Sequence, residues 1–158
     1  MSVISAGLLM YKTNNNNLEI FLVHPGGPLF QNKDAGYWGI PKGLQEDNED
    51  LLQTALREFH EETGITQSGN FLPLGTVKQK NNKTVYAWAF ETLDNNITEI
   101  HSNTFEMEWP PHSGRRQRFP EVDRGNFFSV NSALKKIVEA QRGFIYELKK
   151  VLNKPGKL

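Results

Sequence analysis

Three glutamates, Glu58, Glu61 and Glu62, stand at the spacing of one helical turn. An α-helix turns once every 3.6 residues, so side chains at i, i+3 and i+4 share one face. Like charges this close repel each other, and a divalent cation removes the repulsion. Hard cations such as Mg²⁺ prefer oxygen ligands of this kind. The spacing is compatible with a metal site, although acids at helical spacing more often form a solvated face.

The position of the three acids on their helix favours the metal site. Apolar residues at helical spacing predict a helix over 48–63, with Asp47 or Asn48 as N-cap, acids in its first turn and Gly64 after its end. The three glutamates then occupy its C-terminal half, where the helix dipole disfavours negative charge. A face selected for solubility would carry its acids at the other end.

A longer pattern surrounds these acids. Gly43 is followed after five residues by Glu49, and after seven more by the run REFHEETGI at 57–65. This pattern matches the signature of the Nudix hydrolases at every fixed position of residues 43–65. The order of the flanking segments is also similar to that of a Nudix domain, so the resemblance extends over most of the chain. The segments 102–111 and 119–124 resemble a bacterial branch described as predicted nucleoside-triphosphate pyrophosphohydrolases.

The resemblance implies a fold class and an activity. The fold class is α/β, an α/β/α sandwich with a mixed sheet in which the signature forms a loop–helix–loop. The activity is hydrolysis of a nucleoside diphosphate linked to another group, X, with Mg²⁺ or Mn²⁺ as cofactor. Metal ions suit this chemistry because they neutralise phosphate oxygens and lower the pKa of a bound water.

The same resemblance implies roles for residues of the signature. Arg57 would hold a glutamate in place through a charge-assisted hydrogen bond, Glu49 would brace the loop–helix–loop, and Gly64 would end the helix. The implied metal ligands are the carbonyl of Gly43 and the carboxylates of Glu58, Glu61 and Glu62.

The residue that takes a proton from water is left open. Glu58 and Glu61, beside Arg57, are candidates inside the signature. Glu121 is favoured among the acids outside it, because it directly precedes the last predicted strand; the alternative is a loop carboxylate that faces water. The candidates outside the signature are Glu106, Glu108 and Glu121.

Residues near the signature indicate how a substrate would bind. Lys42 directly precedes Gly43 and is expected to meet a phosphate; the alternative is a surface lysine. Trp38 is a candidate for stacking on a base, although a tryptophan in a short strand more often belongs to the core. Arg116, in the arginine-rich segment 115–118, is a candidate for binding further phosphates, and a solvated loop would show the same residues.

The expected substrate is a nucleoside triphosphate or a dinucleoside polyphosphate. The Pro-Lys-Gly sequence at 41–43 resembles relatives that act on dinucleoside polyphosphates or inositol polyphosphates. The alternatives are ADP-ribose or a nucleotide sugar, and a non-catalytic Nudix module that binds a nucleotide. Action on RNA ends has no support from the net charge, because RNA binding usually leaves a basic footprint.

Composition bounds these interpretations. The 158 residues suit one domain, expected over 1–152, with a frayed tail at 153–158. Lys plus Arg equal Asp plus Glu, 18 each, so neither nucleic acid nor a membrane is an expected partner. The absence of cysteine excludes disulfides, thiolate metal sites and a cysteine nucleophile. The apolar runs are too short for a signal peptide or a membrane span, so we expect a cytoplasmic protein; its oligomeric state is left open.

Several further elements are expected to position the signature helix. Alternating apolar runs predict two hairpins, and proline and arginine residues predict an irregular segment over 101–120. Ser129 is expected to cap a closing helix whose apolar spacing continues to Val151. The predicted strands are 2–10 and 18–24, joined by a turn at 14–17; a short extended piece at 38–43; 71–80 and 84–91; and 127–128.

Overall fold

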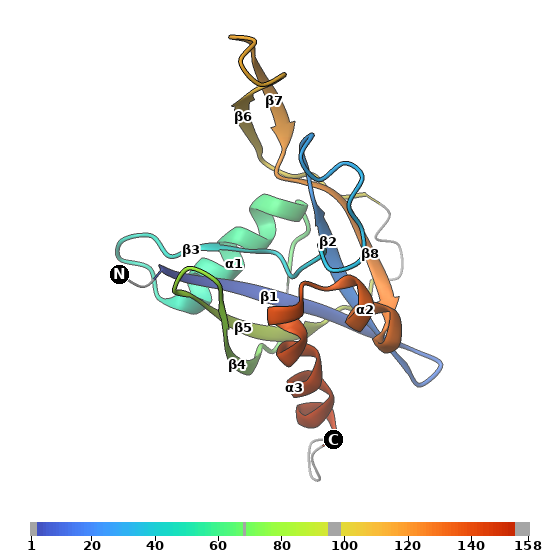
Figure 1. Cartoon of the computed structure of the whole chain (residues 1–158). Coiled ribbons are helices and arrows are strands. Elements are labelled where there is room, and N and C mark those ends of the chain that lie inside the picture. Colours follow the sequence, from blue (N-terminus) through green and yellow to red (C-terminus); the bar gives the residue numbers. More distant parts are fainter. Residues whose placement is uncertain (1–2, 68, 95–98, 154–158) are drawn as a thin grey trace.

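The computed structural model describes residues 3–67, 69–94 and 99–153. Its centre is a six-stranded sheet in the order β4-β5-β1-β2-β8, with β3 paired to β1 (Figure 1). The pair β1–β5 is parallel and the other pairs are antiparallel, so the predicted mixed sheet is confirmed. The strands are β1 (Val3–Asn14), β2 (Asn17–Pro25), β3 (Lys42–Leu44), β4 (Leu72–Gln79), β5 (Lys83–Glu91) and β8 (Val122–Ser129).

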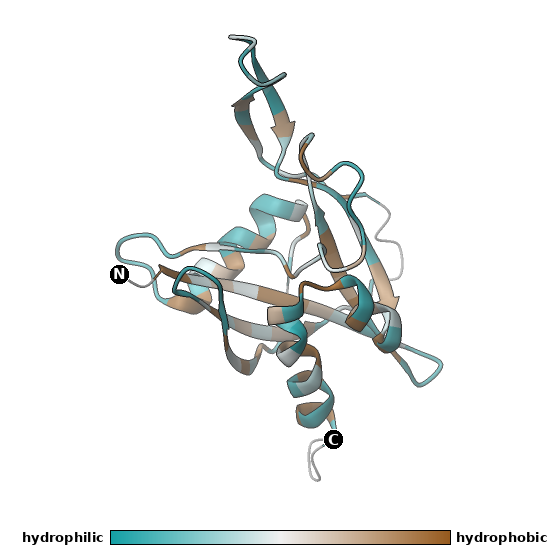
Figure 2. Cartoon of the chain, in the orientation of Figure 1, coloured by the Kyte–Doolittle hydropathy of each residue, from teal (hydrophilic) through white to brown (hydrophobic). Residues whose placement is uncertain are grey.

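Strand β1 runs through the middle of the sheet and is covered on both faces. Side chains alternate between the faces of a strand, so Leu8 and Leu9 belong to two different core clusters. The cluster of Leu8 includes residues of helix α1 (Leu51–Thr63), and that of Leu9 includes residues of helix α3 (Arg142–Leu152). Figure 2 shows hydrophobic and polar residues mixed along both helices. Helices therefore lie on both faces, as in the predicted α/β/α sandwich.

The two predicted hairpins are confirmed, and asparagine pairs form their turns. Asn15 and Asn16 between β1 and β2, and Asn81 and Asn82 between β4 and β5, all have positive φ. Asparagine tolerates this left-handed region better than most residues. These turns set the registers of the two pairs they connect, β1 with β2 and β4 with β5.

Helix α1 begins later than predicted. Asp50 is its N-cap and forms a capping box with Gln53, so the prediction of Asp47 or Asn48 as cap was wrong, as was that of acids in the first turn. Asn48 has a φ of 65°, which no helical residue adopts, so the chain still turns there. Gly64 ends the helix at a φ of 73°, as predicted.

The segment predicted as irregular contains a hairpin. Strands β6 (Thr104–Glu108) and β7 (Arg116–Pro120) pair with each other and project from the main sheet (Figure 1). The proline and glycine residues that led to the prediction of an irregular segment lie in the connection between the two strands. Half-buried Phe105 and Met107 alternate with exposed Glu106, and this alternation is the sequence signal of a strand.

The C-terminal part contains more than one helix. Ser129 caps α2 (Val130–Lys136), as predicted, but the chain then leaves the helix at Ile137. The amide of Val138 donates to the carbonyl of Trp38 at 2.7 Å, which links this break to the loop before β3. A short 3₁₀ turn, η1 (Glu139–Gln141), leads into α3. Residues 154–158 of the predicted tail lie outside the described residues. Among the described residues, no helix is long and apolar enough to cross a membrane.

Candidate active site

Strand β3 brings Gly43 directly under helix α1. A Cβ atom built on Gly43 would lie 2.0 Å from the carboxyl carbon of Glu58, which is far inside van der Waals contact. Only glycine leaves room for the Glu58 carboxylate to rest against the backbone of β3. The first residue of the signature and its first helical glutamate are therefore in contact.

Arg57 connects the loop before α1 to the glutamates. Its Nε donates to Glu49 Oε2 at 2.6 Å and its Nη1 to Glu58 Oε2 at 2.7 Å. Longer contacts reach Glu61 at 3.3 Å and the carbonyl of Leu44 at 3.1 Å. The hydrogen bond from Arg57 lowers the pKa of Glu49 to about 2. These contacts tie the loop, Glu58 and Glu61 into one charged cluster.

Glu62 is the most buried glutamate of the signature, with 9% of its surface exposed. Burial, followed by the charges of Glu58 and Glu121, raises its pKa to about 8, while Lys42 acts in the opposite direction. Burial lowers the pKa of Lys42, and the negative charge of Glu62 raises it. Lys42 and Glu62 are therefore both partly removed from water and close enough for the charge of each to affect the pKa of the other.

Glu121 joins this acidic group from a distant part of the sequence. Beyond the effect of burial, its charge raises the pKa of both Glu58 and Glu62. Its carbonyl accepts a hydrogen bond from the amide of Gly26 at 2.9 Å, where β2 meets β8. Glu106 and Glu108 instead lie on the projecting hairpin, where Glu106 pairs with Arg118 at 3.0 Å. Of the three candidates outside the signature, the structure brings Glu121 to the signature glutamates.

A cavity of about 410 Å³ opens beside these acids. Its lining includes three ionisable residues, Lys42, Glu62 and Glu121, and the aromatic residues Phe30 and Tyr37. The other lining residues are Val23, Pro25, Gly36, Trp38, Gly39, Ile40, Gln79, Val122, Val138 and Gln141. A cavity of this size suits one nucleotide, because small-molecule sites typically measure about 300–1,000 Å³.

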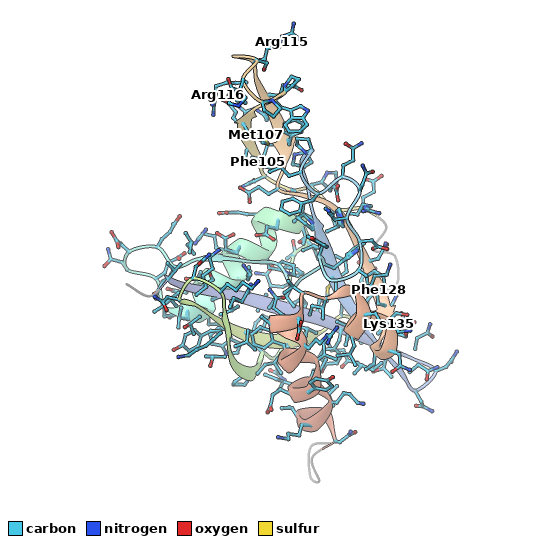
Figure 3. The ribbon with its side chains drawn as sticks, viewed as in Figure 1. Phe105, Met107, Arg115, Arg116, Phe128 and Lys135 are labelled. Atoms are coloured by element: carbon cyan, nitrogen blue, oxygen red, sulfur yellow. The ribbon has the colours of Figure 1, made fainter. Side chains whose placement is uncertain are left out.

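Two predicted substrate residues lie in contrasting places. Trp38 lines the cavity but is only 2% exposed, and its Nε1 donates to Asp34 at 2.8 Å. Arg116 lies on the projecting hairpin, pairs with Glu106 at 3.3 Å and does not line the cavity (Figure 3). Stacking by Trp38 and phosphate binding by Arg116 stay predictions.

The donor set of the signature fits a hard divalent cation. The carboxylates of Glu58, Glu61 and Glu62 and the carbonyl of Gly43 offer oxygen atoms alone, which Mg²⁺ and Mn²⁺ prefer. Burial, followed by repulsion from Glu58 and Glu121, raises the pKa of Glu62, and a bound cation would favour its charged form. Within residues 3–67, 69–94 and 99–153 no three acidic or histidine side chains converge into a ready-made cluster; Glu58 and Glu61 contact Arg57 instead.

Sequence reasoning missed much of the cavity wall. Gln141 is 2% exposed, and its Oε1 accepts a hydrogen bond from the amide of Ile40 at 3.0 Å. The two residues are 101 positions apart, so no local pattern could pair them. Phe30 and Tyr37 carried a signal, because large aromatic side chains in an otherwise polar loop are candidates for ligand contact.

Comparison with known proteins places the fold and the signature in a family. The NUDIX domain profile matches residues 1–148. The mouse bis(5'-nucleosyl)-tetraphosphatase (asymmetrical) is 31% identical over 109 residues, which cover 61% of this chain and 70% of the mouse protein. The Caenorhabditis elegans Ap4A hydrolase in a binary complex has a TM-score of 0.63 at 20% identity, over 95% of this chain and 97% of that one. The NUDIX domain of Shewanella oneidensis NrtR with ADP ribose has a TM-score of 0.64 at 15% identity, over 97% and 90%. The two structures share the fold with this chain.

Proposed function

Because the chain belongs to the Nudix hydrolase family and is a pyrophosphohydrolase of nucleotide-linked pyrophosphates, we propose that it cleaves a dinucleoside polyphosphate in a Mg²⁺-dependent reaction. The observation that carries the proposal is the meeting of Lys42, Glu62 and Glu121 in the lining of a cavity large enough for a nucleotide. The aromatic residues of the same lining, Phe30 and Tyr37 among them, suit a base. The phosphate chain that extends from the nucleoside would then pass the acids of helix α1.

The charges of the site match the needs of the reaction. A pyrophosphate is multiply anionic and repels water as a nucleophile, so cationic groups must neutralise its oxygens. A divalent ion held by Gly43, Glu58, Glu61 and Glu62 would supply this neutralisation and lower the pKa of a bound water.

Other residues have roles that follow from their contacts. The ammonium group of Lys42, at the cavity wall, is placed to bind a phosphate oxygen. Arg57 keeps the carboxylate of Glu58 against Gly43, which fixes its direction. Glu121 lies next to Glu58 and Glu62 without a direct bond to Arg57, and we assign it the role of proton acceptor. Glu58 and Glu61 are the alternative bases.

The substrate class rests on two observations. The Pro-Lys-Gly sequence places Lys42 in the cavity wall, and the mouse relative is a bis(5'-nucleosyl)-tetraphosphatase. A nucleoside triphosphate is the second candidate, because it also presents a chain of phosphates attached to a nucleoside. ADP-ribose, which the Shewanella domain binds in its complex, is the alternative.

A substrate panel tests the proposal. Dinucleoside tetraphosphate, nucleoside triphosphates, ADP-ribose and a nucleotide sugar are each incubated with the protein and Mg²⁺ or Mn²⁺, and the products are separated by ion-exchange chromatography. We expect the dinucleoside tetraphosphate to give a nucleoside triphosphate and a nucleoside monophosphate at the highest kcat/KM. Preference for ADP-ribose would contradict the substrate assignment, and tight nucleotide binding without any turnover would show a non-catalytic module.

A further inference from the structure

His24 is fully buried next to residues that line the candidate active site, and its side chain has no role in the chemistry described above. It lies near the end of β2, between the cavity-lining residues Val23 and Pro25. Its Nδ1 is 2.8 Å from Asp123 Oδ1, and its Nε2 is 2.6 Å from the carbonyl oxygen of Lys33. Both ring nitrogens therefore face oxygen atoms.

One of these two partners fixes where a ring hydrogen must lie. A backbone carbonyl can only accept, so Nε2 must carry a hydrogen. Asp123 Oδ1 also lies 3.6 Å from Arg124 Nε, so the same carboxylate oxygen faces both the ring and the neighbouring guanidinium. The ring of His24 is therefore held from two sides, by the carbonyl of Lys33 and by the carboxylate of Asp123.

The bond to Lys33 reaches across the loop 26–37. Phe30 and Tyr37 on this loop line the cavity. The amides of Phe30 and Lys33 donate to carbonyls inside the loop, at Gly27 and Phe30 respectively. After Lys33 the loop has its own anchors, because Asp34 accepts hydrogen bonds from Trp38 Nε1 and Lys136 Nζ. The ring of His24 thus links the middle of the loop to β2 and, through Asp123, to β8.

We propose that His24 is a positioning residue that holds the loop 26–37 so that its aromatic side chains are set for the nucleotide base. This inference rests on the proposed function for the identity of the ligand. It does not require His24 to touch substrate or to exchange a proton during the reaction. Loosening the loop should therefore weaken substrate binding and leave the chemical step unchanged.

Two substitutions separate the two hydrogen bonds of the ring. The amide nitrogen of asparagine stands near the place of Nδ1, so His24→Asn keeps the contact with Asp123 and loses the one with Lys33. The amide nitrogen of glutamine stands near the place of Nε2, so His24→Gln keeps the contact with the loop. We expect His24→Asn to raise KM about tenfold with kcat within about twofold of wild type, and His24→Gln to restore most of the loss. His101→Asn, at a side chain that is 79% exposed, is the control and should change neither constant.

Equal KM values in the two variants, or a fall in kcat as large as the rise in KM, would overturn the proposal. The ring hydrogens are read independently of activity by ¹⁵N-edited NMR of histidine-labelled wild-type protein at pH 7. A hydrogen-bonded N–H signal from Nε2 of His24 is expected in the wild-type protein, and a ring with no hydrogen on Nε2 would also overturn the proposal. A wild-type protein that hydrolyses no nucleotide would refute the proposed function. The NMR experiment would still test the hydrogen bond from His24 to Lys33, because it does not depend on activity.

Discussion

At the scale of single residues, Glu62 shows most clearly how the site departs from an ordinary acidic helix face. It is nearly buried, and the charges of Glu58 and Glu121 add to the effect of burial on its pKa. An acid that serves only solubility would lie in water, because burial without a nearby cation disfavours the charged form of a carboxyl group. Lys42 offsets only part of the cost.

This burial predicts a pH dependence of stability. The pKa of Glu62 is about 8 in the folded protein, and its ordinary value, which applies to the unfolded chain, is 4.5. Between pH 4.5 and 8, Glu62 is therefore protonated in the folded protein and ionised in the unfolded chain. The stability it contributes is complete below pH 4.5 and is lost as pH rises to about 8. In Glu62→Gln this part of the dependence should disappear.

The measurement is thermal unfolding of chelator-treated protein across pH 4.5–8. Glu147→Gln, on α3, is the matched control and should keep the wild-type slope. Identical slopes in wild type and Glu62→Gln would show that Glu62 is ionised throughout.

Gly43 gives a second prediction at this scale. In Gly43→Ala the new methyl group would displace the Glu58 carboxylate, and a shift of about 1 Å at a catalytic group can cost roughly 100-fold in rate. We expect a loss of that order in kcat/KM. Gly143→Ala is the control, because its Cβ would make an ordinary contact 3.4 Å from Val77. Activity close to wild type in Gly43→Ala would contradict the contact between Gly43 and Glu58.

At the scale of elements, the site depends on a loop held rigidly against α1. Glu49 receives two hydrogen bonds from the guanidinium of Arg57, at 2.6 Å and 3.0 Å. Glu49 also accepts from Thr54 Oγ1 at 2.9 Å, which ties the loop to the first turns of the helix. The planar guanidinium serves the loop and two glutamates together, which a lysine ammonium cannot do.

Arg57→Lys should therefore weaken both the fold and the reaction. We expect a loss of about 1–3 kcal/mol in the free energy of unfolding, from the charged hydrogen bonds, and a fall of at least about tenfold in kcat, from the freed Glu58. Urea unfolding and steady-state kinetics measure the two effects. Wild-type stability would show that the loop does not need the guanidinium.

The N-terminus of α1 supplies another test. Asp50→Ala removes the capping box and should cost about 1 kcal/mol. Asp47→Ala, at the position the sequence predicted as one possible cap, should cost nothing measurable because Asp47 is exposed and outside the helix. Urea unfolding of both variants decides the point, and equal losses would place the cap at neither residue alone.

Elements were predictable where the signal was local. Asparagine turns and alternating apolar runs predicted both hairpins of the main sheet, and Gly64 predicted the end of α1. The start of α1 was misplaced because several polar residues precede it, and sequence alone does not show which one adopts the extended cap conformation. The break at Ile137 depends on pairing with Trp38, 99 positions away, which helical spacing cannot reveal.

At the scale of the whole molecule, the cavity draws on segments from most of the chain. The cavity is lined by residues from five separate elements or connections, among them Val23, Lys42, Gln79, Glu121 and Gln141. The signature glutamates could be predicted because they share one helix. The approach of Glu121 and the pair of His24 with Asp123 required the sheet, in which β2 and β8 are neighbours.

The central claim is that the carboxylates of α1 act on a nucleotide pyrophosphate through a divalent cation. Its most direct test is turnover of a dinucleoside tetraphosphate with saturating Mg²⁺ by Glu61→Gln and Glu62→Gln, compared with Glu147→Gln. Both signature variants are predicted to keep wild-type circular dichroism spectra and to lose at least about 100-fold in kcat, while the control stays active. Full activity in folded Glu61→Gln and Glu62→Gln would contradict the account.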